Sequence, residues 1–73
     1  MSEILLVYDI PKTRNSLLVR IWRRLKKMNA SKIMDSTWSI EDNDINFIVV
    51  KEIMNEIINA GGRAIIIRGE IFE

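Results

Sequence analysis

The sequence predicts an α+β domain whose elements follow the order strand, helix, strand, strand, helix, strand. Three observations support this order. Short apolar runs near both ends have the length of strands, two longer segments repeat apolar residues with a period of 3.6, and a turn-type pair separates two short segments between them. A chain of 73 residues has room for one domain, which we place over residues 1–73.

The first strand is expected at residues 4–8, an apolar run that ends before Pro11. A helix is then expected over residues 14–28, with Thr13 as its N-cap and Asn29 as its C-cap. Its apolar residues fall in one arc when each residue is advanced by about 100°. They are Leu17, Leu18, Ile21, Trp22, Leu25 and Met28.

Residues 32–34 and 37–40 are expected to form a hairpin, because Asp35 and Ser36 between them form a turn-type pair. The second of these strands alternates, so one face should carry Trp38 and Ile40 and the other Thr37 and Ser39. Both tryptophans, Trp22 and Trp38, are expected in the core.

A second helix is expected after Asp42, which could cap it, with Asp44 in its first turn. Residues 47–50 could form a strand on propensity alone, but the helical period continues without a break, which favours a helix. Gly61 and Gly62 should end it, and residues 63–68 form the last strand. The expected apolar arc is Phe47, Val49, Val50, Ile53, Met54, Ile57, Ile58 and Ala60.

This order of elements predicts a ferredoxin-like βαββαβ fold: a four-stranded antiparallel sheet with two helices on one face. The first and last strands are apolar on both faces, whereas a sheet with one wet face should alternate. We therefore expect a homodimer through the face without helices. The alternative is that the C-terminal residues fold over that face.

Composition excludes several kinds of site. The sequence has no cysteine and no histidine, which removes disulfides, thiolate metal sites and the commonest general base. Neither a signal peptide nor a membrane-length apolar run is visible, so we expect a cytoplasmic protein.

Charge is distributed unevenly, although the net charge is only +1. Seven of the 11 basic residues lie between Lys12 and Lys27, mostly on the first helix. A dense basic face could contact the phosphates of a nucleic acid or of a larger nucleoprotein complex, although most such faces are simply solvated. The residues expected to do so are Arg20, Arg23, Arg24 and Lys27.

Several short motifs resemble known proteins. They are residues 5–11 (LLVYDIP), the Arg-rich helix with Trp22–Lys26 inside it, residues 36–38 (STW) and residues 60–64 (AGGRA). Together they resemble the small CRISPR-associated ferredoxin-like nucleases and the similar domains of phenylacetate-operon repressors and chromate-resistance regulators. The resemblance implies a dimer in a nucleic-acid context. Within these 73 residues we find neither the winged-helix part of the repressors nor the longer C-terminal tail of the nucleases, so we expect a departure from the resemblance in these two respects.

The same resemblance implies a role for Asp9, which matches the proposed magnesium ligand of the nucleases. One Asp9 from each protomer at a two-fold axis could hold Mg²⁺, whose bound water could attack a phosphodiester. Asp9 is then both the catalytic and the metal-binding candidate. The other interpretation is a structural aspartate in the turn before Pro11. Two functions follow: a dimeric nucleic-acid-associated binding or scaffold module, which we favour, and a metal-dependent endonuclease acting on RNA or DNA.

Overall fold

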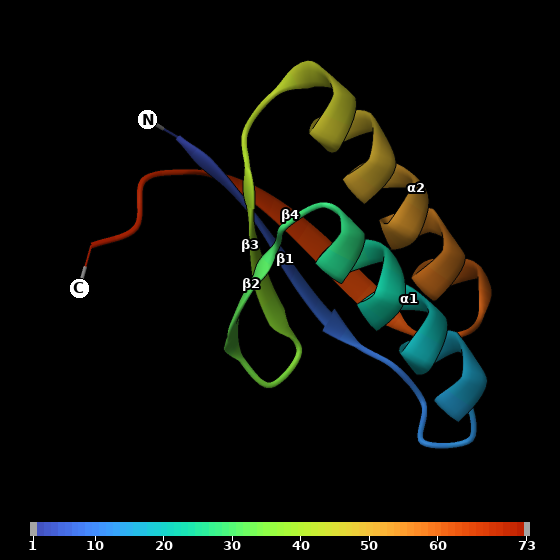
Figure 1. Ribbon diagram of the computed structural model, residues 1–73. Helices are drawn as coiled ribbons and strands as arrows, with labels where there is room; N and C mark the ends of the chain where they lie inside the picture. Colours follow the sequence, from blue (N-terminus) through green and yellow to red (C-terminus); the bar gives the residue numbers. More distant parts are fainter. Residues whose placement is uncertain (1, 73) are drawn as a thin grey trace.

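A computed structural model describes residues 2–72 and has the expected order of elements (Figure 1). The elements are β1 (Glu3–Asp9), α1 (Asn15–Lys27), β2 (Ser31–Met34), β3 (Thr37–Glu41), α2 (Asp44–Asn59) and β4 (Arg63–Gly69). The strands lie in the order β2-β3-β1-β4, and every neighbouring pair is antiparallel. This confirms the ferredoxin-like α+β topology.

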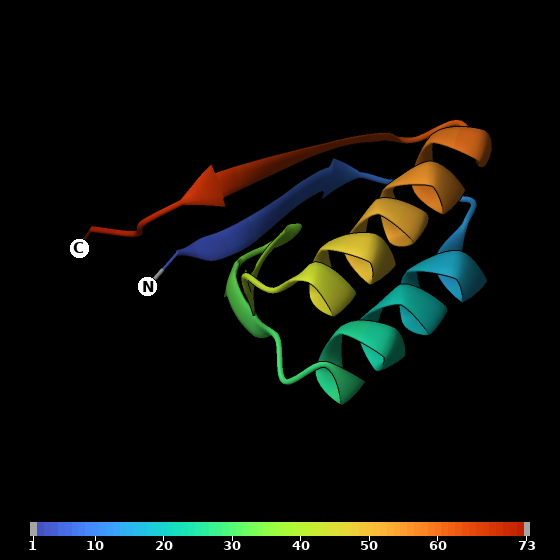
Figure 2. The same ribbon diagram turned by 90° about the horizontal axis from the view of Figure 1, so that it is seen from above.

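Both helices cover the same face of the sheet, and the other face has no helix over it (Figure 2). The alternation of β1 explains the core between the two layers, because Ile4, Leu6 and Tyr8 point toward the helices. The buried apolar residues that meet them are Leu17, Ile21, Leu25, Trp38, Ile40, Val50, Ile53 and Ile57. Of the arc expected on α2, Ile58 departs, since it is 48% exposed.

Both helices end in a left-handed residue that turns the chain back. Asn29 has φ 59°, and the next amide, that of Ala30, donates to the carbonyl of Leu25 at 3.0 Å. Gly61 has φ 89°, and the amide of Gly62 donates to the carbonyl of Ile57 at 2.9 Å. These are Schellman caps, with Met28 and Ala60 as the last half-helical residues. The C-cap of α1 is therefore Met28, and Asn29, the expected C-cap, is the next residue after it.

The two expected N-caps are wrong by one residue each. The chain before α1 makes a turn closed by the amide of Arg14 on the carbonyl of Pro11, so Arg14 occupies the cap position and Thr13 lies outside it. At α2 the cap is Asn43, whose side chain accepts from the amide of Asn46 at 2.8 Å. Asp42 instead turns toward β4.

The phenol of Tyr8 joins the two tryptophans inside the fold. The indole N–H groups of Trp22 and Trp38 each donate to the Tyr8 hydroxyl oxygen at 3.1 Å. Trp38 is buried and Trp22 half-buried, so both belong to the core, as expected.

No helix within residues 2–72 has the length and apolar character needed to cross a membrane.

Candidate dimer and nucleic-acid surfaces

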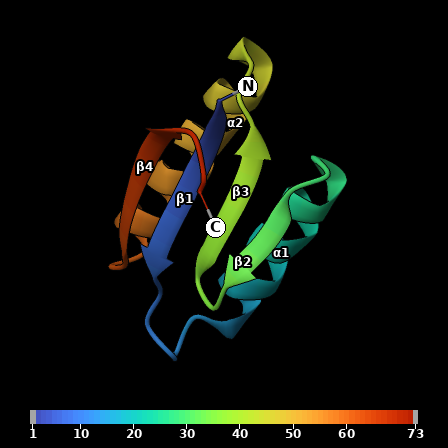
Figure 3. The same cartoon turned by 90° about the vertical axis from the view of Figure 1, so that its left-hand side faces the viewer.

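The face of the sheet without helices carries a paired apolar patch, which we call the open-face patch. It consists of Leu5 and Val7 on β1 and Ile65 and Ile67 on β4, in register as Leu5 opposite Ile67 and Val7 opposite Ile65. Ile65 is 55% exposed and Ile67 48% exposed. Figure 3 looks onto this face, with β4 and β1 in front of α2. Isoleucines this exposed on a sheet of a small domain are typical of an interaction surface.

The C-terminal residues cross the other half of the same face. Figure 3 shows the chain turning after β4 and passing in front of β1 toward β3. Ile71 there faces a hollow that it shares with Glu3, Ser31, Ile33 and Ser39. Phe72 is 87% exposed. The C-terminal segment therefore lies over the middle of this face and leaves Ile65 and Ile67 exposed, together with Ile33 of β2, which is 41% exposed.

Ser39 shows how this half differs from the open-face patch. It is the one polar residue among those described that is buried, and its hydroxyl donates to a Glu3 carboxylate oxygen at 2.6 Å. The serine is thereby satisfied without water. The β2–β3 half thus combines a buried, hydrogen-bonded serine with the exposed Ile33, whereas the open-face patch is apolar throughout.

The structure divides the four expected basic residues of α1 into two pairs. Arg24 forms ion pairs with Glu56 and, at 3.5 Å, with Glu52, while Arg20 reaches Glu56 at 3.5 Å. Both arginines therefore join α1 to α2. They are less available to a phosphate than the sequence indicates.

Arg23 and Lys27 lie on the outer side of α1 and are exposed. Within residues 2–72 neither forms an ion pair, and the same holds for the exposed Lys26. We call Arg23, Lys26 and Lys27 the outer basic surface. Lys26 was not among the four residues expected to contact phosphates, although it lies on the same basic arc of this helix.

Asp9 is the last residue of β1 and is exposed on the open face, opposite Arg63 of β4. Both border a shallow hollow of about 250 Å³ with Val7 and Ile65. Among the described residues no group of three carboxylate, histidine or cysteine side chains could hold a metal ion. One chain therefore offers a single carboxylate, with a cation across from it, so a Mg²⁺ site would need a second chain.

The structural interpretation of Asp9 also lacks direct support. In residues 2–72 its carboxylate accepts no side-chain or turn hydrogen bond; the turn before α1 is closed by backbone groups alone. Its carbonyl, by contrast, packs tightly, since a Cβ added to Gly62 would lie 2.6 Å from the Asp9 carbonyl oxygen. Backbone packing, more than the carboxylate, holds this corner.

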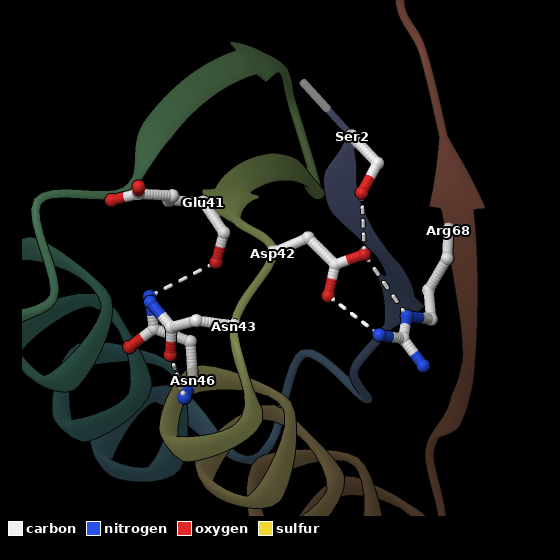
Figure 4. A network of polar contacts seen from close by, with 6 residues as sticks. All are labelled: Ser2, Glu41, Asp42, Asn43, Asn46 and Arg68. Carbon is white, nitrogen blue, oxygen red and sulfur yellow. Dashed lines mark hydrogen bonds and ion pairs between the residues drawn. The ribbon is translucent and has the colours of Figure 1, made fainter.

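Asp42 belongs to a polar network that the sequence did not indicate (Figure 4). Its carboxylate accepts two hydrogen bonds from the Arg68 guanidinium, at 2.8 and 3.1 Å, and one from the Ser2 hydroxyl at 2.7 Å. These bonds, with Arg68 first, hold the pKa of Asp42 below its ordinary value of 3.8. The guanidinium also lies 4.5 Å from the centre of the Phe47 ring. This network fixes the start of α2 to the end of β4.

Comparisons with family models, with curated proteins and with solved structures give no match to this chain. The ferredoxin-like topology implied by the resemblance is present.

Proposed function

We propose that this protein is a homodimeric nucleic-acid-binding module. In this proposal two copies pack through the open-face patch, and the outer basic surface of α1 contacts phosphates. The observation that carries the binding is the absence of any ion-pair partner, among residues 2–72, for Arg23, Lys26 and Lys27.

The dimer is supported by the exposure and pairing of the open-face patch. Ile65 and Ile67 are about half exposed, and the residues beside them on β1, Leu5 and Val7, are only partly buried. A standard interface covers about 800 Å² on each partner. The whole domain exposes 5222 Å², so such an interface would take about 15% of its surface. In a two-fold symmetric dimer the open-face patch of one protomer would pack against the same patch of its partner.

The nucleic-acid surface is supported by where the charges are neutralised. Glu52 and Glu56 neutralise the side of α1 that faces α2, through Arg20 and Arg24. The cations on the outer side keep their full charge for an external anion. Phosphate contacts of this kind give affinity without sequence preference. Neither tryptophan is used for stacking in this proposal, because Trp38 is buried and the Lys32 ammonium lies 5.2 Å from the centre of the half-buried Trp22 ring.

A metal-dependent endonuclease is the second candidate, and one observation favours it. Asp9 lies on the same face as the open-face patch, so in a dimer through that patch both Asp9 carboxylates lie on the sheet faces that meet. Cleavage of RNA and DNA with Mg²⁺ or Mn²⁺ distinguishes the candidates. Robust cleavage that Asp9→Asn abolishes would make this protein an enzyme; a binding module shows none in either protein.

Titration of a labelled single-stranded RNA and a labelled duplex DNA tests the proposed function. The double charge reversal Arg23→Glu with Lys27→Glu should abolish binding. The matched control is Lys12→Glu with Lys51→Glu, which changes the net charge equally at exposed positions outside the outer basic surface and the open-face patch, and should retain most of the affinity. Equal losses in the two variants would show that only the net charge matters, and would reject the proposed surface.

A further inference from the structure

β4 is an edge strand with a free backbone. It pairs with β1 on one side only and runs for seven residues, while β2, at the opposite edge, is four residues long and irregular. Figure 3 shows β4 along one border of the sheet. Long apolar edges are uncommon in monomeric proteins, because their unpaired groups accept a further strand.

The pairing pattern identifies which backbone groups are free. The amide of Tyr8 donates to the carbonyl of Ser36 at 3.0 Å, so the backbone groups of Tyr8 point toward the β3 side. Backbone direction alternates along a strand, so those of Val7 point toward β4 and bond with its partner Ile65. The residues that send both N–H and C=O outward are then Ala64, Ile66 and Arg68.

A groove runs beside this edge on the helix side. Its volume is about 360 Å³, and its lining residues are Phe47, Lys51, Met54, Ile66 and Arg68. Three of them are apolar and two are cations, both close to the Phe47 ring: Arg68 at 4.5 Å and the Lys51 ammonium at 5.6 Å from its centre. No carboxylate lines the groove. An added strand would place alternate side chains over it.

We propose that the edge of β4 accepts an extended segment of a partner protein, with apolar side chains in this groove and a carboxylate beside Lys51. The outward N–H and C=O groups of Ala64 and Ile66 supply the affinity for an extended backbone, and the groove supplies the preference for particular side chains. This site shares β4 with the open-face patch but uses the outer edge and the helix side of that strand, and it does not depend on the proposed function.

Charge complementarity favours such a partner over the β4 edge of a second copy. Two β4 edges paired with each other would bring Lys51 of both chains, which lacks an ion-pair partner within residues 2–72, to one seam. Like charges directly opposite destabilise a strand pair. An acidic segment instead meets the Lys51 ammonium, which forms no ion pair within residues 2–72, whereas the Arg68 guanidinium is already paired with Asp42.

The probe is a short capped peptide of valine and threonine with one central glutamate, and its control is the same peptide with lysine in that place. Binding is followed on ¹⁵N-labelled protein by NMR. We expect the amides of Ala64 and Ile66 to shift and gain exchange protection, with the acidic peptide binding roughly tenfold tighter than the lysine peptide. Ala64→Pro, which removes one outward N–H but no bond to β1, should abolish binding.

Lys51→Glu keeps the test decisive if the proline variant fails to fold, because Lys51 is exposed. It should reverse the preference in favour of the lysine peptide, whereas Lys26→Glu on α1 should leave the preference unchanged. Three results would overturn the proposal: equal affinity for the two peptides, shifts confined to the open-face patch, or protection of Ala64 and Ile66 that rises with protein concentration when no peptide is present.

Discussion

Arg68 and Asp42 form a two-pronged ion pair that joins the end of β4 to the turn between β3 and α2. The Asp42 side chain is only 7% exposed, and the guanidinium that covers it also lies over Phe47 of α2. One arginine thus ties the last strand to both the loop and the helix that precede it.

Asp42→Asn should lower stability near neutral pH and make the protein less sensitive to acid. The pKa of Asp42 is lower in the folded protein than in the unfolded chain, so its stabilisation is present above the ordinary value of 3.8. It is lost as pH falls through the folded pKa. Urea unfolding of both proteins between about pH 7 and pH 2 measures this. If the free energies of unfolding of the wild type and the variant differ by the same amount at every pH, the ion pair does not contribute to the pH dependence of stability.

Tyr8→Phe should destabilise the protein by about 1–3 kcal/mol, because two indole N–H groups lose the one acceptor that they share among residues 2–72. The phenyl ring keeps the apolar packing, so the loss belongs to the hydroxyl. Denaturant unfolding followed by tryptophan fluorescence gives the free energy. A change below about 0.5 kcal/mol would mean that water replaces the phenol at both indoles.

Gly62→Ala should cost more stability than Gly61→Ala, although Gly61 has the strained backbone angle. A Cβ at Gly62 meets the Asp9 carbonyl oxygen at 2.6 Å and the Ile57 side chain at 2.8 Å. We expect about 2–3 kcal/mol there and about 1 kcal/mol at Gly61, where nothing lies within 4 Å. Thermal unfolding of the two variants ranks them, and the reverse order would contradict the packing described at this corner.

Ile65→Glu should convert a dimer to a folded monomer. Wild-type protein at micromolar concentration should sediment with twice the 8.5 kDa mass of the chain. The variant should weaken association at least tenfold, about 1.4 kcal/mol, and keep its helical circular dichroism. Ile48→Glu, which alters a 59% exposed isoleucine on the outer side of α2, is the matched control. Wild-type protein that sediments as a monomer would show that the open-face patch does not form a dimer interface.

The fold could be read from the sequence because its signals are local. The period of α1, the alternation of β3 and the glycines after α2 each reflect a single element, and each element appears within two residues of its expected place. Residues 47–50 have strand propensity, but they belong to α2. The helical period places Val50, Ile53 and Ile57 together on the buried face of this helix.

What the sequence could not give depends on contacts between distant elements. Asp42 has the composition of a cap, but Arg68, 26 residues later, binds its carboxylate. In the sequence, Arg20 and Arg24 belong to a basic face that could simply be solvated. In the folded protein Glu56 of α2 lies beside them and forms ion pairs with both. The free edge of β4 follows from the strand order, which no single segment of the chain encodes.

The salt dependence of nucleic-acid binding tests the central claim most directly. If Arg23, Lys26 and Lys27 neutralise phosphates, affinity should fall steeply and linearly on a logarithmic scale as salt rises. Lys27→Ala should reduce that slope by about one for each protomer in contact with the nucleic acid, while Lys51→Ala leaves it unchanged. Absence of binding at low salt, or a slope that Lys27→Ala does not alter, would contradict the account.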